Sequence, residues 1–467
     1  MMERKEPTMH VIPTISVAGS HRRAIAVTAL IVCVLAAFAP QTLAETRAIT
    51  FEEAVDIGLQ RNLGLLLTAN LRGLDDASVS DALWRFLPDL RLSVSGSRSF
   101  EKTQTESGGT SWTTGTSLST GISAGVTLFD GFANTSSLRE ARFEQAAGNL
   151  DYARARQTVV FQVITDYLAL IEATEQERVR RENLTAQEEQ IARVRALVEE
   201  GERPINELYQ QEANVAEAKL ALVEARRTLE LSRVDLVQTL HLDPLEEIDF
   251  IIPSADALDP GDATETFAAL VETAILARAD LAAEMERLSA SGERVTQAKS
   301  GRWPTLSLSG SFASRYSDAV DGDFFAQLDD RQSAGVGLSL SFPLFDRMQT
   351  RNAMHRAEIN LENAEIALDQ LRQDVALQIR RAVLDRDAAR ESLSTALTRV
   401  AAAREALSYT NERYLAGAST LFEVTLARAD LVSAESGEVN ARYRLLWQNH
   451  LVEYYVGTLE SEAGLGR

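Results

Sequence analysis

Hydrophobic residues recur at helical spacing over most of this chain, and two segments stand out by their length. Residues 131–200 and 347–416 each run for about 70 residues without a proline, which corresponds to about 105 Å of continuous helix. In the second segment an apolar residue returns every seven positions, at Leu361, Leu368, Val375 and Ala382. Such a seam, interleaved with small residues, favours close packing of one helix along another. The pattern predicts two very long helices.

Each long helix is predicted to turn back into a shorter one. Gly201 and Gly417 follow the long segments, and glycine at φ > 0 is typical of helix ends. Shorter helices are expected at about 204–240 and 420–456, and another at about 49–85 before the first strands. In each half, the helix before the strands and the helix after the turn together span about 108 Å, which is close to the length of the long helix. We therefore expect them to stack end to end alongside it.

Between the first helix and the long helix of each half, the apolar period changes to two residues, as in strands with one apolar and one small polar face. One apolar face comprises Leu118, Ile122, Ala124, Val126 and Leu128, and Ser, Gly and Thr occupy the alternate positions. Strands are predicted near 90–100, 117–129, 305–316 and 333–342. The segments between them, residues 98–116 and 317–332, are predicted to be loops.

The two halves are copies of one unit. Phe267 lies 216 residues after Phe51, and the same offset relates Leu65 to Leu281, Pro88 to Pro304 and Gly201 to Gly417. A period this long is not that of a solenoid. We interpret residues 45–250 and 266–467 as two structural repeats, each containing a helix, two strands, a long helix and a further helix. Residues 251–265 are the predicted linker.

The N-terminus has the pattern of an export signal. Arg22 and Arg23 precede an apolar run over residues 24–38, and a small residue suited to cleavage stands at Ala44. The alternative is a membrane anchor, but the run is short for a spanning helix. We therefore predict a signal peptide over residues 1–44.

Removal of this leader changes the composition of the chain. The full sequence carries a net charge of −21, and the leader contains four basic and two acidic residues, so the mature chain is more acidic and a poor partner for nucleic acid. The only cysteine, Cys33, lies in the leader, so the mature chain is expected to have no disulfide or thiolate metal site. Lipidation of Cys33 is not expected, because Val32 is bulky at the position where a lipidation signal has a small residue. The segment before the apolar run is long, so translation can start at Met1 or at Met9.

The predicted strands suit a bilayer, because no mature segment approaches 18 consecutive apolar residues and each strand has an apolar face. Four strands cannot close a barrel, and an open edge in hydrocarbon leaves backbone groups unpaired. The strands would then close with other copies: two give eight strands, and three give twelve with room for a lumen. The small polar inner face favours an open interior. The alternative is a soluble β-hairpin packed on the helices.

Short motifs occur in corresponding order in the two halves. They are Phe-Glu-Glu-Ala-Val at 51–55, Leu-Pro at 87–88, Leu-Phe-Asp-Gly at 128–131, Phe-Pro-Leu-Phe-Asp at 342–346, and Tyr-Leu-Ala-Gly at 414–417 leading into Leu-Phe-Glu-Val at 421–424. By these motifs the whole mature chain resembles the TolC-type outer-membrane efflux proteins of Gram-negative bacteria.

This resemblance implies a mainly α-helical fold with a membrane β-barrel, in which four strands per protomer complete a twelve-stranded barrel in a homotrimer. It implies a coiled-coil helical tunnel across the periplasm, with the barrel in outer-membrane lipid and the loops 98–116 and 317–332 outside the cell. The implied partners are a periplasmic adaptor protein and an inner-membrane transporter of the RND, ABC or MFS type.

Catalytic and cofactor motifs are not found. The sequence has no nucleophile elbow, phosphate loop, zinc-protease motif or dinucleotide fingerprint, and its five histidines show no ligand spacing. We therefore predict no enzyme activity, no cofactor and no metal site. Five aspartates crowd the second predicted loop: Asp318, Asp321, Asp323, Asp329 and Asp330. A cation site and a solvated acidic loop are the two alternatives there.

The resemblance assigns the two helix turns to the periplasmic tips. The candidate adaptor-docking residues are Gly201, Pro204, Gly417 and Thr420. In the family, two acidic residues three apart ring the tunnel entrance after the second turn. Here Glu423 stands at the first position but Leu426 at the second, and Glu207 is the counterpart of Glu423 in the first half. Glu423 and Glu207 are the candidate aperture residues, and the alternative is that Glu423 complements its own helix dipole.

The leading functional hypothesis is a passive exit duct of a tripartite efflux pump or a type I secretion system. The alternatives are a stand-alone diffusion porin and an exported coiled-coil scaffold without a pore. The long helices favour the duct, since a porin has no use for them. The cargo, the transporter class and the choice between drug efflux and protein secretion stay open, because a duct need not discriminate.

Overall fold

The computed structural model describes residues 47–104, 108–246, 248–253 and 265–459. The predicted signal peptide and most of the predicted linker lie outside these residues. The chain divides into a small unit, residues 1–48 and 246–249, and a large unit containing the rest. Strands β1 (Arg47–Ile49) and β4 (Ile248–Phe250) pair in a two-stranded sheet, most of which belongs to the small unit. The helices and the four longer strands belong to the large unit.

The two long helices are present at the predicted positions. Helix α4 (Ala133–Glu199) and helix α9 (Gln349–Leu415) each contain 67 residues, and their bounds differ by the offset found in the sequence. An aspartate of the repeated Leu-Phe-Asp motif stands shortly before each helix. Asp130 accepts a hydrogen bond from the Asn134 amide at 2.9 Å, and Asp346 accepts one from Thr350 at 2.7 Å. The motif therefore satisfies amides of the first turn, which have no partner within the helix.

The first helix of each half is broken, contrary to the prediction of one helix over about 49–85. Helices α2 (Phe51–Arg61) and α3 (Leu63–Trp84) meet at Asn62, which is extended (φ −61°, ψ 118°). The Asn62 side chain accepts a hydrogen bond from Leu65 N at 3.0 Å and so caps α3. Asparagine competes with helical hydrogen bonding in this way. The apolar period continues across the break, so it gives no sign that the helix ends there.

The second half breaks at the equivalent position. Helices α6 (Phe267–Ala277) and α7 (Ala279–Lys299) meet at Arg278, which has nearly the same backbone conformation as Asn62 (φ −74°, ψ 118°). Arg278 provides no side-chain cap for α7, so the break is a property of the duplicated unit rather than of one residue type.

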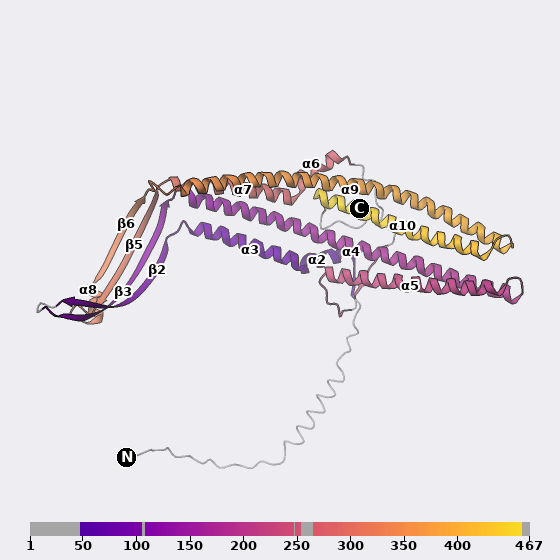
Figure 1. The fold of residues 1–467 in the computed structure, drawn as a ribbon, viewed down its shortest axis with the longest axis horizontal. Helices are drawn as coiled ribbons and strands as arrows, with labels where there is room; N and C mark the ends of the chain where they lie inside the picture. Colours follow the sequence, from indigo (N-terminus) through magenta and orange to yellow (C-terminus); the bar gives the residue numbers. More distant parts are fainter. Residues whose placement is uncertain (1–46, 105–107, 247, 254–264, 460–467) are drawn as a thin grey trace, which may run out of the picture. The chain divides into compact units, whose positions relative to one another are not determined.

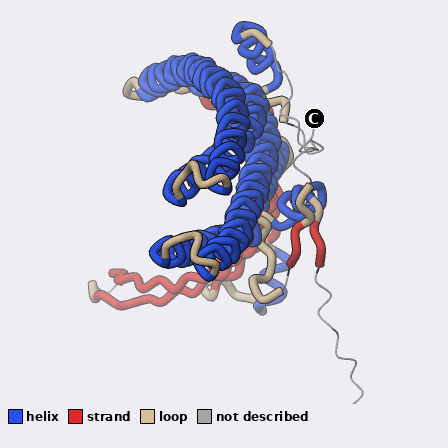
Figure 2. The backbone as a smooth tube through the Cα atoms, turned by 90° about the vertical axis from the view of Figure 1, so that its right-hand side faces the viewer, coloured by secondary structure: helices blue, strands red, loops and turns tan. Residues whose placement is uncertain are grey.

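The shorter helices pack along the long ones as predicted. Helices α3 and α5 (Ile205–Thr239) contact α4, and helices α7 and α10 (Leu421–Val456) contact α9. Helix α4 also contacts α7 and α10, which joins the two halves. Figure 2 shows these helices of the large unit side by side in one curved layer. An apolar core forms where α6, α9 and α10 meet, including Leu270, Ile379 and Val452. Among the described residues, none of the helices combines the length and the apolar character that a membrane-spanning helix needs.

The four longer strands form one antiparallel sheet in the order β2 (Asp89–Gln104), β3 (Thr110–Phe129), β5 (Thr305–Ser317) and β6 (Gln332–Ser341). Strands β2 and β6 are the edges of this sheet. The predicted loop 98–116 is wrong, because β2 and β3 extend through most of it. Side-chain hydrogen bonds cross between the strands within this range. The Ser99 hydroxyl donates to the Gly115 carbonyl at 3.3 Å, and the Thr113 hydroxyl donates to the Glu101 carbonyl at 3.1 Å. Cross-strand bonding of this kind stabilises a ladder that the residue types alone suggest is a loop.

The predicted loop 317–332 is also corrected, since it contains helix α8 (Phe324–Asp330). Asp323 caps this helix by accepting a hydrogen bond from Phe325 N at 3.3 Å. The buried Gln327 side chain donates to the carbonyl of Val320 at 2.7 Å and accepts from Ser317 N at 3.0 Å. The Gln327 amide therefore links parts of the acidic segment, and no cluster able to hold a metal ion occurs among the described residues.

Candidate functional site at the helix turns

Both helix turns end in the predicted left-handed glycine. Gly201 has φ +78° and Gly417 has φ +74°. After each glycine the chain donates back to the long helix, from Glu202 N to Leu197 O at 2.9 Å and from Ala418 N to Arg413 O at 2.8 Å. These bonds satisfy carbonyl groups that a helix end leaves without a partner. No atom lies within 4 Å of a Cβ built at either glycine, so the backbone conformation alone requires glycine there.

The returning helices begin at equivalent positions but are capped differently. Pro204 is extended (φ −74°, ψ 146°) and stands just before α5, which begins within one residue of the expected position. Thr420 stands just before α10, and its hydroxyl accepts a hydrogen bond from Glu423 N at 3.3 Å. Only the second turn has a side-chain cap, because proline has no group that can accept the helix amides.

A polar contact joins the two turns. The Tyr414 hydroxyl, at the end of α9, donates to Glu207 Oε2 on α5 at 2.9 Å. Arg203 donates to the Tyr414 carbonyl at 2.8 Å, and its guanidinium lies 4.4 Å from the centre of the Tyr414 ring. Arg203 also forms an ion pair with Glu207 at 3.9 Å. Burial, followed by the bond to Glu207, raises the pKa of Tyr414 to about 12.

An apolar cluster lies beside this contact and contains side chains of α4, α9 and α10. Its buried members are Val194, Leu407, Tyr414, Leu421 and Val424. The tips of the two helix hairpins are therefore packed together within one chain. Burial of these side chains provides the main attraction, and the contact of Arg203, Tyr414 and Glu207 fixes which groups meet.

The two candidate aperture carboxylates have separate partners. The Ser419 hydroxyl donates to the carboxylate of Glu423, whose amide is capped by Thr420. Glu207 is bound by Tyr414 and Arg203. Among the described residues no hydrogen bond or ion pair links Glu423 to Glu207. The sequence pattern did not reveal the roles of Ser419, Arg203 and Tyr414. Tyr414 is the first residue of the Tyr-Leu-Ala-Gly motif at 414–417, which could have indicated it.

Exposed apolar side chains gather at both turns. Phe422 is 72% exposed and Leu426 is 53% exposed, and they lie one helical turn apart on α10. Three further residues near the turns are more than half exposed: Ile205, Tyr209 and Leu415. Contiguous exposed apolar residues on a protein surface are typical of sites that bind another protein.

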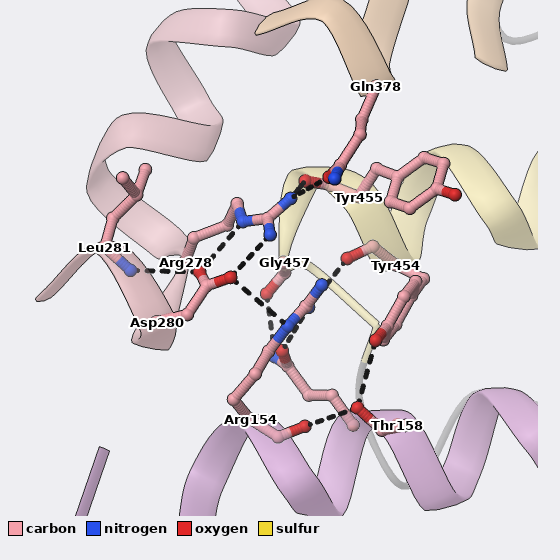
Figure 3. Close-up of polar contacts among 10 residues, drawn as sticks. Arg154, Thr158, Arg278, Asp280, Leu281, Gln378, Tyr454, Tyr455 and Gly457 are labelled. Carbon is pink, nitrogen blue, oxygen red and sulfur yellow. Dashed lines mark hydrogen bonds and ion pairs between the residues drawn. The ribbon is translucent and has the colours of Figure 1, made fainter. Parts of the chain in front are cut away.

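A second polar network closes the far end of α10 (Figure 3). Arg278 donates to the Tyr455 carbonyl at 2.9 Å and to Asp280 at 2.9 Å. Arg154 donates to the Tyr454 carbonyl at 2.9 Å and stacks 4.0 Å from the centre of the Tyr454 ring. Burial opposes ionisation of Asp280, but hydrogen bonding to Arg278 and the two nearby guanidinium charges outweigh it and lower the pKa of Asp280. These groups satisfy the last carbonyls of α10 and anchor it to α4 and α7.

The comparison with known families decides the identity of the chain. The outer membrane efflux protein family matches residues 59–240 and 270–454, which are most of the chain and include both repeats. The chain belongs to the outer membrane efflux protein family. Its predicted resemblance, its function as an outer-membrane efflux channel and its location in the outer membrane, extending into the periplasm, are thereby confirmed.

Individual relatives agree with this family. The chain is 24% identical to the outer membrane efflux protein BepC of Brucella suis biovar 1 (strain 1330) over 351 residues, which cover 75% of this chain and 74% of BepC. It is 25% identical over 356 residues to the proteases secretion protein PrtF of Dickeya chrysanthemi, covering 72% of this chain and 74% of PrtF. One of these relatives is named for efflux and the other for the secretion of proteases.

A solved structure confirms the fold. The outer membrane channel CmeC of Campylobacter jejuni aligns with a TM-score of 0.72 and 21% sequence identity, covering 89% of this chain and 87% of that chain. At this identity the alignment shows a common fold. The predicted fold class, long helices combined with four strands per chain in a duplicated arrangement, is confirmed.

Proposed function

We propose that this family member works as a homotrimer whose twelve strands close a barrel. The observation that carries the proposal is the open sheet: β2 and β6 are its edges, and apolar residues such as Leu92 and Leu338 are exposed on it. Backbone groups on an open edge have no partner in hydrocarbon, so each edge requires another strand. A second and a third copy supply such strands, and three copies leave room for a lumen.

The helices support a duct rather than a stand-alone porin. Helices α4 and α9 have 67 residues each, which corresponds to about 100 Å. A diffusion porin needs only the membrane-spanning strands. Helices of this length suit a tunnel that crosses the periplasm and receives cargo from an inner-membrane transporter.

The mass of the assembled protein tests this proposal. The mature chain, purified from membranes in mild detergent, should give a trimer by native mass spectrometry and by chemical cross-linking. Finding only monomers or dimers would contradict the trimer. Recovery of the protein in the soluble periplasmic fraction would instead support the scaffold without a pore.

The partners we propose are a periplasmic adaptor and an inner-membrane transporter of the RND, ABC or MFS type. The adaptor would dock at the tips formed by Gly201, Pro204, Gly417 and Thr420, where the exposed side chains of Phe422 and its neighbours supply apolar contact area. BepC is named as an efflux protein and PrtF as a protease secretion protein, so both kinds of system suit a chain of this family.

A pair of substitutions tests the docking site. Phe422→Ser removes an exposed apolar group at the tip, and Leu276→Ser removes a similarly exposed one on α6 as the matched control. In cells, cross-linked recovery of inner-membrane partners should fall for Phe422→Ser and not for Leu276→Ser, while both variants still insert as trimers. Equal recovery from the two variants would count against docking at the tips.

We also propose that the protein is not an enzyme. The carboxylates at the turns serve as hydrogen-bond partners of Tyr414, Ser419 and Arg203, which is a structural use of such groups. Conduction through a passive duct needs no reacting group. Hydrolysis of a cargo by the purified trimer would contradict this part of the proposal.

A further inference from the structure

Three helices enclose a polar crevice above the packed tips. Helices α4, α5 and α10 each line it with residues three, four and seven positions apart, which lie on one helix face. The crevice has a volume of about 170 Å³. The polar side chains that matter for its chemistry are Arg180, Asn183, Gln187, Asn214, Glu217 and Arg428. The crevice thus lies between the first helix hairpin and the second.

Arg428 brings a guanidinium group into this crevice. Within the described part of the chain it forms no ion pair, and its Nε atom is buried with no hydrogen-bond partner. Burial lowers the pKa of Arg428, and the nearby charge of Arg193 lowers it further, whereas Glu189 and Glu435 oppose the shift. A guanidinium stays protonated in proteins at ordinary pH. The buried Nε–H of Arg428 lacks an acceptor, and a negative ligand in the crevice would supply one.

Other groups around Arg428 also suit an anion. Arg180 lines the crevice from α4 and, among the described residues, has no ion pair. Asn183 has a buried Oδ1 atom without a partner, and an amide that is turned over would present its NH₂ group instead. Gln187 and Asn214 have fixed positions, since Gln187 accepts from Gln211 at 2.6 Å. Asn214 donates to Thr425 at 3.2 Å.

The one acidic side chain lining the crevice is Glu217, on α5. It is exposed, and no ion pair joins it to Arg428 or Arg180 within the described residues. Glu189 and Glu435 also lie near enough to act on Arg428, but among the described residues neither forms an ion pair with it.

We propose that this crevice binds one small oxyanion, such as sulfate, phosphate or a free carboxylate, between Arg428 and Arg180. The donors of Arg428 come from α10 and those of Arg180 from α4, so the bound anion links the two helix hairpins. Binding to the folded chain alone stabilises the packed arrangement of the hairpins by mass action. The proposal stands whether or not the protein conducts cargo.

Thermal unfolding of the purified full-length mature protein in detergent tests this site. At constant ionic strength and pH 7, replacing chloride by sulfate or phosphate should raise the unfolding temperature and reach a plateau. Salting-out by sulfate also stabilises proteins, but that effect shows no plateau at low concentration. Acetate under the same conditions tests whether a carboxylate suffices.

Substitutions identify the binding groups. Arg428→Gln and Arg180→Gln should weaken the apparent affinity for sulfate by about tenfold or more, as expected when a hydrogen bond to a charged group is lost. Arg444→Gln removes an exposed cation from the same helix and should leave the affinity unchanged. An equal response of Arg428→Gln and Arg444→Gln, or the absence of a plateau in the unchanged protein, would overturn the proposal.

Glu217→Gln separates a free anion from a carboxylate of the chain itself. If the crevice takes an anion from solution, removal of the neighbouring negative charge should tighten sulfate binding several-fold. If Glu217 swings onto Arg428 and serves as its counter-ion, only the Glu217→Gln variant should bind sulfate. Binding confined to this variant would overturn the proposal.

Discussion

At the scale of single residues, the sequence predicts local geometry and misses partners that are distant in sequence. Gly201 and Gly417 could be placed at the turns because a left-handed helix end has a strong residue preference. The contact of Tyr414 with Glu207 could not be predicted, since it depends on how two hairpins pack. Both candidate aperture carboxylates were chosen by position, and their hydrogen-bond partners became visible only in the structure.

Tyr414→Phe measures the contact between the turns. Loss of the hydroxyl should lower the free energy of unfolding at neutral pH by about 1–3 kcal/mol, because Glu207 loses a donor. Tyr409→Phe is the control, since Tyr409 is exposed on the same helix. Equal unfolding temperatures of the two variants would show that the contact contributes nothing.

The same substitution predicts a change in alkaline stability. The pKa of Tyr414 is raised to about 12, above the value near 10 of an unfolded tyrosine. The neutral hydroxyl therefore contributes stability that is complete below about pH 10 and is lost as the pH rises toward 12. Burial raises the pKa values of Tyr167 and Tyr443 to about 12 as well. Tyr414→Phe should thus reduce, but not abolish, the loss of stability in this window, and an unaltered pH profile would contradict the assignment.

At the scale of elements, the apolar period correctly predicted the long helices and strands but failed where capping or pairing decides. The break at Asn62 interrupts no apolar pattern, so period alone joins α2 to α3. The Ser-, Thr- and Gly-rich segment 98–116 has the composition of a loop, but β2 and β3 pair with each other through most of it. The duplication was the most informative signal, because elements of one half recur in the other at the same offset.

Asn62→Ala tests the capped break between α2 and α3. Removing the side chain that accepts from Leu65 N should lower the free energy of unfolding by about 1 kcal/mol. Asn70→Ala, at an exposed position inside α3, should leave stability unchanged or raise it slightly, because alanine is the better helix former. Thermal unfolding of the two variants distinguishes a cap from a general effect of asparagine. A lower stability of Asn70→Ala than of Asn62→Ala would contradict the capping role of Asn62.

At the scale of the whole molecule, the protomer has an open sheet and packed helix hairpins, and it belongs to the outer membrane efflux protein family. The sequence predicted these features because the four strands and the long helices each carry a regular pattern. It could not predict how the two hairpin tips meet, which depends on contacts of side chains such as Arg203 that are more than 200 residues from their partner.

Ion selectivity tests the proposed aperture. If three copies of Glu423 line a narrow entrance, their field should favour cations over anions. Glu423→Lys should then weaken or reverse the cation preference, measured as the reversal potential of the trimer in a planar bilayer under a salt gradient. Glu438→Lys is the control, because Glu438 lies on the same helix and is paired with Arg442 away from the turn. An unchanged permeability ratio in Glu423→Lys would place Glu423 outside the conduction path.

Cross-linking of the two sheet edges tests the central claim most directly. The only cysteine of the sequence lies in the predicted leader, so introduced cysteines are the only thiols of the mature chain. Ser95→Cys on β2 would be combined in turn with a cysteine at Gly335, Gly337 or Ser339 of β6. Three positions are needed because the pairing register between β2 of one copy and β6 of the next decides which two thiols meet. We predict that at least one combination gives a disulfide-linked trimer on oxidation, and neither single variant does. Linkage only within single chains, or into dimers alone, would contradict closure of the barrel by three copies.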